Sequence, residues 1–282
     1  MNTPASMLRV APTSALILSY AKEMYTDPLS RKYMQYIDLG DVQPLVAAIS
    51  QLNVPLEGII QLRKKMVRYL VRQFISRYPQ QQICIMAAGL DPLGLQLAAE
   101  YPQLINGIYE MDQAWMEDKG RIYRNIAPQL SLPVTLLTDI THTIQCKRQL
   151  RDAGYDASQP AIIILEGIVP YITEEQFRDI IQCFSTKNAR NTVIMDYLLP
   201  AEDLRPAATR HAYNEVTGLL QRSLGVELYY YSRKKILNIL ELLQAEIHDV
   251  YDMHTVEEKL YGYNNLYPHR GDSWLEMAAF HL

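Results

Sequence analysis

Seven short apolar segments, separated by stretches of helical character, constrain the fold of this 282-residue chain more than any other feature. In chain order the segments are QICIMAA, INGIYEM, PVTLLTD, AIIILEG, NTVIMDYL, EIHDVYDM and WLEMAAFHL. Strands that are apolar along most of their length and alternate with helices are typical of a mostly parallel sheet covered on both faces. No helix follows the last segment, so we expect it to enter the sheet antiparallel. The sequence therefore predicts an α/β fold.

Two helical regions accompany this pattern. Residues 1–80 have helical spacing of apolar positions, and residues 54–79 within them read as one long amphipathic helix. A second region, residues 199–246, lies between the fifth and sixth apolar segments and is longer than one crossover connection needs. An insertion near the carboxyl edge of the sheet is well placed to form a lid over a ligand pocket. We predict an N-terminal helical segment, 1–80, that covers the site, and one α/β domain, 81–282.

The charge of the chain argues against a nucleic-acid partner. The net charge is −4, and the basic residues are scattered except for a cluster between residues 63 and 72. Binding to a phosphate backbone normally needs an extended basic face. The cluster has the spacing of a solvated helix face, with Arg63 as the candidate exception.

The cysteines and the N-terminus indicate the compartment. Cys84, Cys146 and Cys183 lie far apart and show neither a C-x-x-C pair nor metal-ligand spacing with histidine, so we expect no disulfide scaffold and no metal site. The apolar stretch SALILSYA is too short to span a bilayer, and no signal-peptide pattern precedes it. We therefore expect a cytoplasmic protein with no membrane partner; the sequence leaves its oligomeric state open.

The stretch ICIMAAGLDPLGLQLA, residues 83–98, reads as a strand, a turn and a helix. In open α/β sheets, ligands bind beyond the carboxyl ends of the strands, where the chain must let them approach the backbone closely. Gly89 removes a side chain at this turn, and Ala87 and Ala88 keep the neighbouring walls small. A dinucleotide pyrophosphate would need the G-x-G-x-x-G pattern, which is missing here. The turn is therefore a candidate ligand contact of another kind.

Acidic residues follow three successive predicted strands. Asp112 is placed to accept hydrogen bonds from ribose hydroxyls, with a helix N-cap as its structural alternative. Asp139 could meet an adenine amino group, and Glu166 ends the fourth strand. Several carboxylates without a basic phosphate cradle favour a nucleoside that carries positive charge over one that carries phosphates.

Several stretches also occur in a characteristic order. They are SALILSYAK, TDPLSRKY, Arg63 in the long helix, AAGLDPLGLQLA, EMDQAWMEDK, TDI and LEGIVPYIT. In this order and spacing the chain resembles the leucine carboxyl methyltransferase family, a branch of the S-adenosylmethionine-dependent methyltransferases. The resemblance implies a Rossmann-like class I methyltransferase fold with a seven-stranded sheet, and S-adenosyl-L-methionine as the cofactor.

The resemblance also implies a role for individual residues. Arg63 would pair with the carboxylate of the cofactor's methionine part, Asp112 would hold the ribose, and Lys22 would cover the site. The other implied cofactor contacts are Ala87, Ala88, Gly89 and Asp91 in the loop, Asp139 and Ile140 around the adenine, and Glu166 of the Glu-Gly motif. Ala87 replaces a glycine expected in the family, and Pro170 replaces a larger apolar residue on the substrate side.

These observations predict an S-adenosylmethionine-dependent O-methyltransferase acting on a small-molecule or carrier-held acceptor, as in natural-product biosynthesis. A carboxylate acceptor is already ionised at neutral pH and needs no general base. A hydroxyl acceptor would need one, for which His142 and His211 are candidates, and Tyr171 is a candidate for the acceptor pocket. Two alternatives remain: methyl transfer to nitrogen or carbon, and a non-catalytic cofactor-binding or partner-binding protein of the same fold.

Overall fold

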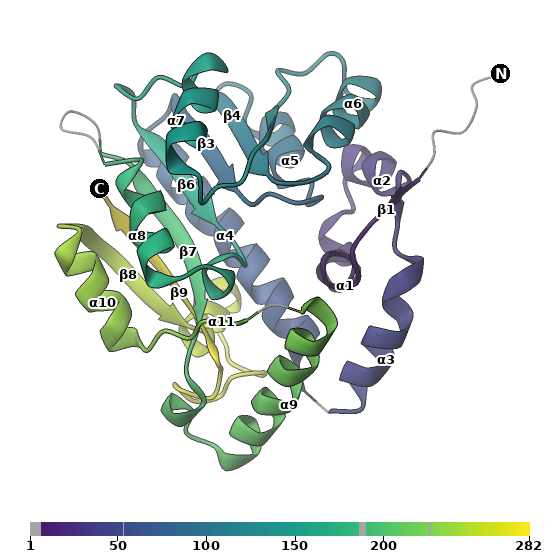
Figure 1. The fold of residues 1–282 in the computed structure, drawn as a ribbon, viewed down its shortest axis with the longest axis vertical. Coiled ribbons are helices and arrows are strands. Elements are labelled where there is room, and N and C mark those ends of the chain that lie inside the picture. The colour runs from purple at the N-terminus through teal and green to yellow at the C-terminus, as the bar shows by residue number, and fades with distance from the viewer. Residues whose placement is uncertain (1–6, 53, 186–189, 226) are drawn as a thin grey trace.

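The computed structural model describes residues 7–52, 54–185, 190–225 and 227–282, and a seven-stranded sheet runs through its centre (Figure 1). The strand order is β5-β4-β3-β6-β7-β9-β8. The strands are β3 (Gln81–Met86), β4 (Ile105–Asp112), β5 (Val134–Leu137), β6 (Ala161–Leu165), β7 (Thr192–Leu198), β8 (Glu246–Asp252) and β9 (Leu275–His281). Strands β3 to β7 pair in parallel, and β9 is antiparallel to both β7 and β8. All seven predicted segments and the antiparallel last strand are confirmed.

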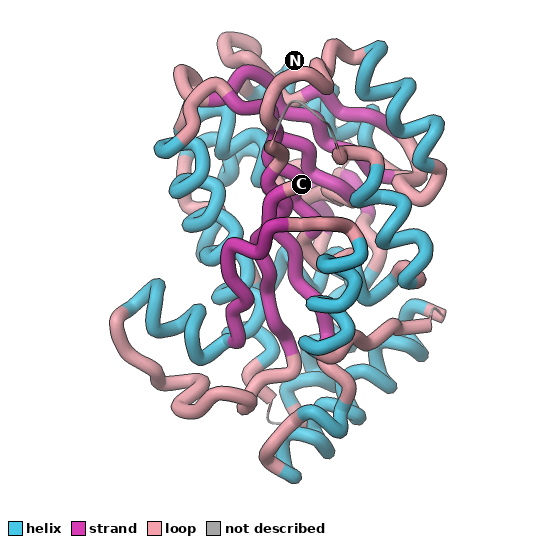
Figure 2. Tube along the Cα trace, turned by 90° about the vertical axis from the view of Figure 1, so that its left-hand side faces the viewer, coloured by secondary structure: helices cyan, strands magenta, loops and turns pink. Residues whose placement is uncertain are grey.

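Helices cover both faces of the sheet (Figure 2). In Figure 1, α7 (Thr143–Asp152), α8 (Glu174–Gln182) and α10 (Arg233–Leu242) lie in front of the sheet, and α4 (Leu56–Arg77) lies behind it. Every residue of β3 and β6 is buried, whereas the edge strand β5 is partly exposed. Continuous apolar runs such as AIIIL are stable in this position because neither of their faces meets water.

The N-terminal region contains the predicted helices and one element that the sequence pattern missed. Its helices are α1 (Pro12–Tyr20), η1 (Lys22–Met24), α2 (Pro28–Met34), η2 (Gly40–Val42), α3 (Gln43–Ser50) and α4. A parallel pair of two-residue strands, β1 (Leu8–Arg9) and β2 (Ile37–Asp38), was not predicted, because so short a strand shows no alternation of apolar and polar residues. The division of the chain at residue 80 stays an interpretation.

The helical region between β7 and β8 has two parts with different surroundings. Helix α10 buries Ile236, Ile239 and Leu240 and serves as an ordinary crossover helix. The extra element is α9 (Ala207–Leu224), preceded by the short η4 (Ala201–Asp203). Helix α9 contacts α1, so two helices that are far apart in the sequence meet, and both line a cavity at the carboxyl ends of the strands. Within the described residues, no helix has the length and apolar character needed to cross a lipid bilayer.

A buried ion pair ties β4 to the neighbouring helices. Oε2 of Glu110 lies 3.1 Å from Nζ of Lys119 on α6 (Met116–Ile126), and both side chains are fully buried. Burial raises the pKa of Glu110 above its usual value, although Lys119 opposes the shift. The backbone N–H of Gly94, on α5 (Leu93–Glu100), donates to Oε1 of the same carboxylate at 3.2 Å. A Cβ at Gly94 would lie 2.8 Å from Cδ of Glu110, so only glycine fits this approach.

We therefore expect Gly94→Ala to lower the free energy of unfolding by about 1–3 kcal/mol, measured by urea denaturation, because the added methyl group displaces a buried charged side chain. Gly218→Ala is the matched control. A Cβ at Gly218, on α9, would meet only the flexible end of Arg222 at 3.3 Å. This variant should be neutral or stabilised by up to about 1 kcal/mol through helix propensity. Equal effects of the two substitutions would contradict the packing argument.

Candidate active site

A cavity of about 240 Å³ opens at the carboxyl ends of β3, β6 and β7. Its walls also come from α1, α4, α9 and the start of β9. Of the residues predicted for the site, Arg63, Ala87, Ala88, Gly89, Asp91, Glu166 and Tyr171 line it. The cavity therefore brings together residues that lie more than 100 positions apart in the sequence, at the edge of the sheet where ligands are expected.

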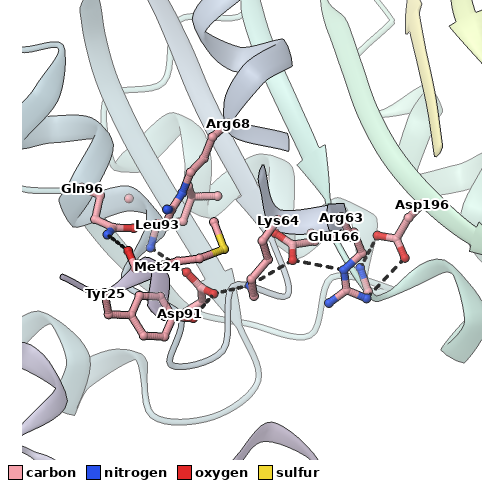
Figure 3. A network of polar contacts seen from close by, with 12 residues as sticks. Met24, Tyr25, Arg63, Lys64, Arg68, Asp91, Leu93, Gln96, Glu166 and Asp196 are labelled. Carbon is pink, nitrogen blue, oxygen red and sulfur yellow. Dashed lines mark hydrogen bonds and ion pairs between the residues drawn. The ribbon is translucent and has the colours of Figure 1, made fainter. Parts of the chain in front are cut away.

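The Arg63 guanidinium, which lines this cavity, lies between two carboxylates (Figure 3). Its Nε donates to Oε1 of Glu166 at 3.2 Å, and its Nη1 lies 3.5 Å from Oδ2 of Asp196. Leu165 and Met195 are partners across β6 and β7, which places the next residues, Glu166 and Asp196, side by side. Burial alone would lower the pKa of Arg63, but Asp196 and Glu166 hold it above its usual value. Arg63 is therefore a fixed cation in a buried position.

Asp196 was not predicted from the sequence, because it stands alone in the apolar run NTVIMDYL. It is 1% exposed, and its Oδ1 accepts a 2.6 Å hydrogen bond from the N–H of Gly167. Burial raises the pKa of Asp196, and Arg63 opposes the shift. Among the described residues, Oδ2 of Asp196 has no hydrogen-bond donor. The feature of the sequence that could have identified Asp196 as a site residue is its position, as an acid near the carboxyl end of a buried strand.

Lys64 corrects the expectation of a solvated basic face on α4. It is 5% exposed and forms ion pairs with Asp91 and, at 2.9 Å, with Oε1 of Glu166. The signal that could have found it is helical spacing, because Lys64 follows Ile60 by four residues and precedes Val67 by three, and both are buried. Burial would lower the pKa of Lys64, but the two acids raise it above its usual value.

Asp91 connects this network to the loop after β3. Besides Lys64, it accepts hydrogen bonds from the Tyr25 hydroxyl at 2.9 Å and from the N–H of Leu93 at 2.8 Å (Figure 3). Burial would raise the pKa of Asp91, but Lys64, Arg68 and the Tyr25 hydroxyl together hold it below its usual range. Asp91 is therefore an anion in the folded protein, and it fixes the start of α5.

The loop from Ala87 to Asp91 adopts a backbone that favours glycine at two positions. Ala87 has φ 52° and Gly89 has φ 50°, both in the left-handed region. The predicted substitution of glycine by Ala87 is thus accommodated at a conformational cost of about 1–2 kcal/mol. A Cβ at Gly89 would meet nothing within 4 Å, so the loop leaves open space there. The open space beside Gly89 is what we expect of a turn whose backbone a ligand approaches closely.

The Asp112 carboxylate accepts a hydrogen bond from the backbone of this loop. Its Oδ2 accepts a 2.9 Å hydrogen bond from the N–H of Gly89, and its Oδ1 accepts from the N–H of Ala114 at 3.2 Å. The N-cap alternative for Asp112 is wrong, because α6 begins at Met116 and Trp115 occupies the capping position. Asp112 borders the cavity through Gly89 without being part of its lining. Its role toward a ribose stays a prediction.

The remaining predicted residues lie outside the cavity lining. Asp139 accepts hydrogen bonds from the N–H and the hydroxyl of Thr141 at 2.9 and 2.7 Å, and Ile140 beside it is buried. The structure links this segment to the loop, because the N–H of Thr138 donates to the carbonyl of Asp112 at 2.8 Å. Asp139 and Ile140 thus continue the same edge of the sheet, and their part in adenine binding stays a prediction.

Three basic candidates are placed away from the cavity. Lys22 is exposed on η1, and His211 is exposed on α9. His142 lies directly before α7. None of the three lines the cavity. Lys64, and not Lys22, is the lysine that the structure brings to the site.

A family model described as leucine carboxyl methyltransferase matches residues 16–185, which is more than half of the chain. A curated protein of Mycobacteroides abscessus, named as an S-adenosyl-L-methionine-dependent methyltransferase, is 35% identical over 94 residues. These residues are 33% of this chain and 30% of that protein, so the match spans under a third of the relative.

Two solved structures share the fold. A methyltransferase structure from Thermobifida fusca has a TM-score of 0.66 at 15% identity, covering 89% of this chain and 92% of that chain. A DUF574 family protein from Streptomyces avermitilis has a TM-score of 0.58 at 12% identity, covering 95% and 96%. The sequence resemblance is thus confirmed by the family model, and the Rossmann-like methyltransferase fold by the solved structures. The chain belongs to the leucine carboxyl methyltransferase family of S-adenosylmethionine-dependent methyltransferases.

Proposed function

We propose that this protein transfers the methyl group of S-adenosyl-L-methionine to a carboxylate oxygen of a small-molecule or carrier-held acceptor. The observation that carries the proposal is the Arg63 guanidinium, held between Glu166 and Asp196 in the cavity that Gly89 also lines. Its five N–H donors allow it to keep these partners and also to bind a ligand carboxylate. We propose natural-product biosynthesis as the biological setting. We also propose a reducing, cytoplasmic compartment, which the free thiols of the three cysteines support.

The residues present fit the cofactor in charge and in shape. Three acids, Asp91, Glu166 and Asp196, and two cations, Arg63 and Lys64, line the cavity, so its charged side chains leave an excess of negative charge. This excess suits a ligand with a sulfonium and an ammonium group. Gly89 leaves room where a side chain would stand. We assign the methionine carboxylate to Arg63, the ammonium group to the acids and the ribose to Asp112.

The surroundings favour an acceptor that needs no base. The cofactor supplies an activated methyl group, whose carbon–sulfur bond breaks as the carbon–oxygen bond forms, while the sulfur keeps the electron pair. Among the described residues that line the cavity there is no histidine, and His142 and His211 lie elsewhere. Tyr171 is not a base at neutral pH either, because a phenol has an ordinary pKa of about 10 and is protonated there. What the protein contributes to a carboxylate acceptor is position and exclusion of water.

One observation favours a hydroxyl acceptor as a second candidate. Asp196 lines the cavity and its Oδ2 has no hydrogen-bond donor among the described residues. A buried carboxylate of raised pKa is a suitable general base for a hydroxyl. A nitrogen or carbon acceptor that loses a proton would use the Asp196 carboxylate in the same way. The alternative of a non-catalytic module rested on Ala87, which the loop accommodates.

Arg63→Ala should weaken binding of S-adenosylmethionine by about 1.5–3 kcal/mol, or roughly 10- to 150-fold in Kd, because a charged hydrogen bond is lost. Isothermal titration calorimetry measures the change. Arg72→Ala is the matched control, because Arg72 lies on the same helix and is exposed. An unchanged Kd in Arg63→Ala would remove this residue from the cofactor site.

Asp196→Asn separates the two acceptor chemistries. For a carboxylate acceptor, kcat at saturating cofactor should be independent of pH around neutrality in both proteins, because no proton is transferred, although loss of the partner of Arg63 lowers its value. For a hydroxyl acceptor, kcat should fall by about 10²- to 10⁴-fold, the usual contribution of a general base. A wild-type kcat that rises with pH through the titration of one group, and a variant kcat that no longer does, would therefore reject the carboxylate proposal.

Ala87→Gly should bind the cofactor at least as tightly as the wild type. Its free energy of unfolding should be unchanged or raised by up to about 1 kcal/mol, because glycine relieves the left-handed backbone but loses more chain entropy. Ala88→Gly, at a neighbouring position without a positive φ, should instead lose about 0.5–1 kcal/mol. Calorimetric titration and urea denaturation test both variants. Weaker cofactor binding in Ala87→Gly would show that the methyl group is needed.

A further inference from the structure

The cavity has a second half whose walls are apolar. Beyond the charged groups at the strand ends, it is bounded by Leu16 of α1, Val216 and Leu220 of α9, and Trp274 beside β9. The rings of Tyr213 and Trp274 stack with centroids 5.3 Å apart and an interplanar angle of 20°, and both residues belong to the lining. The half next to the proposed methionine site thus offers hydrocarbon and aromatic surface.

Two hydroxyl groups on the α9 wall of the cavity donate to the protein's own backbone. The Tyr213 hydroxyl donates to the carbonyl of Leu199 at 2.7 Å. The Thr217 hydroxyl donates to the carbonyl of Tyr213 at 2.9 Å. Because these donors are engaged, Tyr213 and Thr217 present mainly their apolar surfaces to an occupant.

Several polar and charged side chains of α9 also lie outside the cavity lining. Arg210 donates to the carbonyls of Leu204 and Arg205, and His211 and Glu215 are exposed. None of these three residues contributes to the lining. Helix α9 is therefore amphipathic, and the apolar side, with Val216 and Leu220, faces the cavity.

These walls distinguish between two kinds of carboxylic acid. A peptide that entered with its C-terminus would bring amide N–H and C=O groups next to the hydrocarbon of Leu16, Val216 and Leu220, and each amide left unpaired is costly to bury. An acid with a hydrocarbon or aromatic body would bury its apolar surface at a gain. We propose that the acceptor is a free monocarboxylic acid with an uncharged, apolar body, held between α1 and α9. This inference rests on the proposed methyl transfer to a carboxylate.

Binding of decanoic acid to the protein saturated with S-adenosylhomocysteine tests the assignment of the apolar half, using calorimetry. Leu220→Asn should weaken binding of decanoate at least tenfold, and Leu220→Met should keep it within threefold. Leu219→Asn is the matched control, because Leu219 neighbours Leu220 on α9 but does not line the cavity. All three variants should bind S-adenosylhomocysteine like the wild type, which shows that they fold. Equal decanoate binding in Leu220→Asn and Leu219→Asn would overturn the assignment.

A methyl-transfer assay with labelled S-adenosylmethionine then compares decanoic acid and 3-phenylpropanoic acid with a leucine-terminated tetrapeptide. The proposal predicts labelled methyl esters of the apolar acids and at least tenfold lower turnover of the peptide. Methylation of the peptide alone, or of none of the three despite bound cofactor, would overturn the inference but leave cofactor binding standing. Failure of the wild type to bind the cofactor would instead reject the proposed function itself.

Discussion

The Arg63 guanidinium between Glu166 and Asp196 is the interaction on which the site depends. It joins α4 to the carboxyl ends of β6 and β7, and Lys64 extends it through Asp91 to the loop after β3. A buried ion pair contributes little net stability, but removal of one partner leaves an uncompensated charge. The network therefore fixes geometry: it holds the cation in one place between the proposed cofactor and acceptor halves. Gly167 completes it, because a Cβ there would lie 3.1 Å from Nη1 of Arg63.

Much of the fold was predictable because its physical signal is local. A strand such as AIIIL can be buried on both faces only inside a covered sheet, and WLEMAAFHL had no helix after it to make a parallel crossover. The paired strands β1 and β2 were not predictable, because two residues are too few to show a pattern. The separation of α9 from α10 was also missed, since both helices are amphipathic and only packing reveals which one lies on the sheet.

The site was predictable where a residue type was unusual for its position, and less so where charges are buried together. Gly89 and Glu166 stand out at strand ends, and both line the cavity. Lys64 and Asp196 were missed, because a lysine on a basic helix and one acid in an apolar strand look ordinary without their partners. Lys22, His142 and His211 show the converse: a suitable side chain in the expected region of the sequence need not reach the cavity. Electrostatic networks are formed across the fold, and spacing along one element does not show them.

If the charged, glycine-lined cavity holds S-adenosylmethionine, the purified protein must bind this compound without an acceptor. Calorimetric titration of the purified wild-type protein with S-adenosylmethionine, and separately with S-adenosylhomocysteine, tests it most directly. We expect saturable binding of both compounds at one site per chain. S-adenosylmethionine should lose more affinity as salt is raised, because its sulfonium charge interacts with an excess of acids. No heat of binding and no rise in melting temperature with either compound would contradict the account.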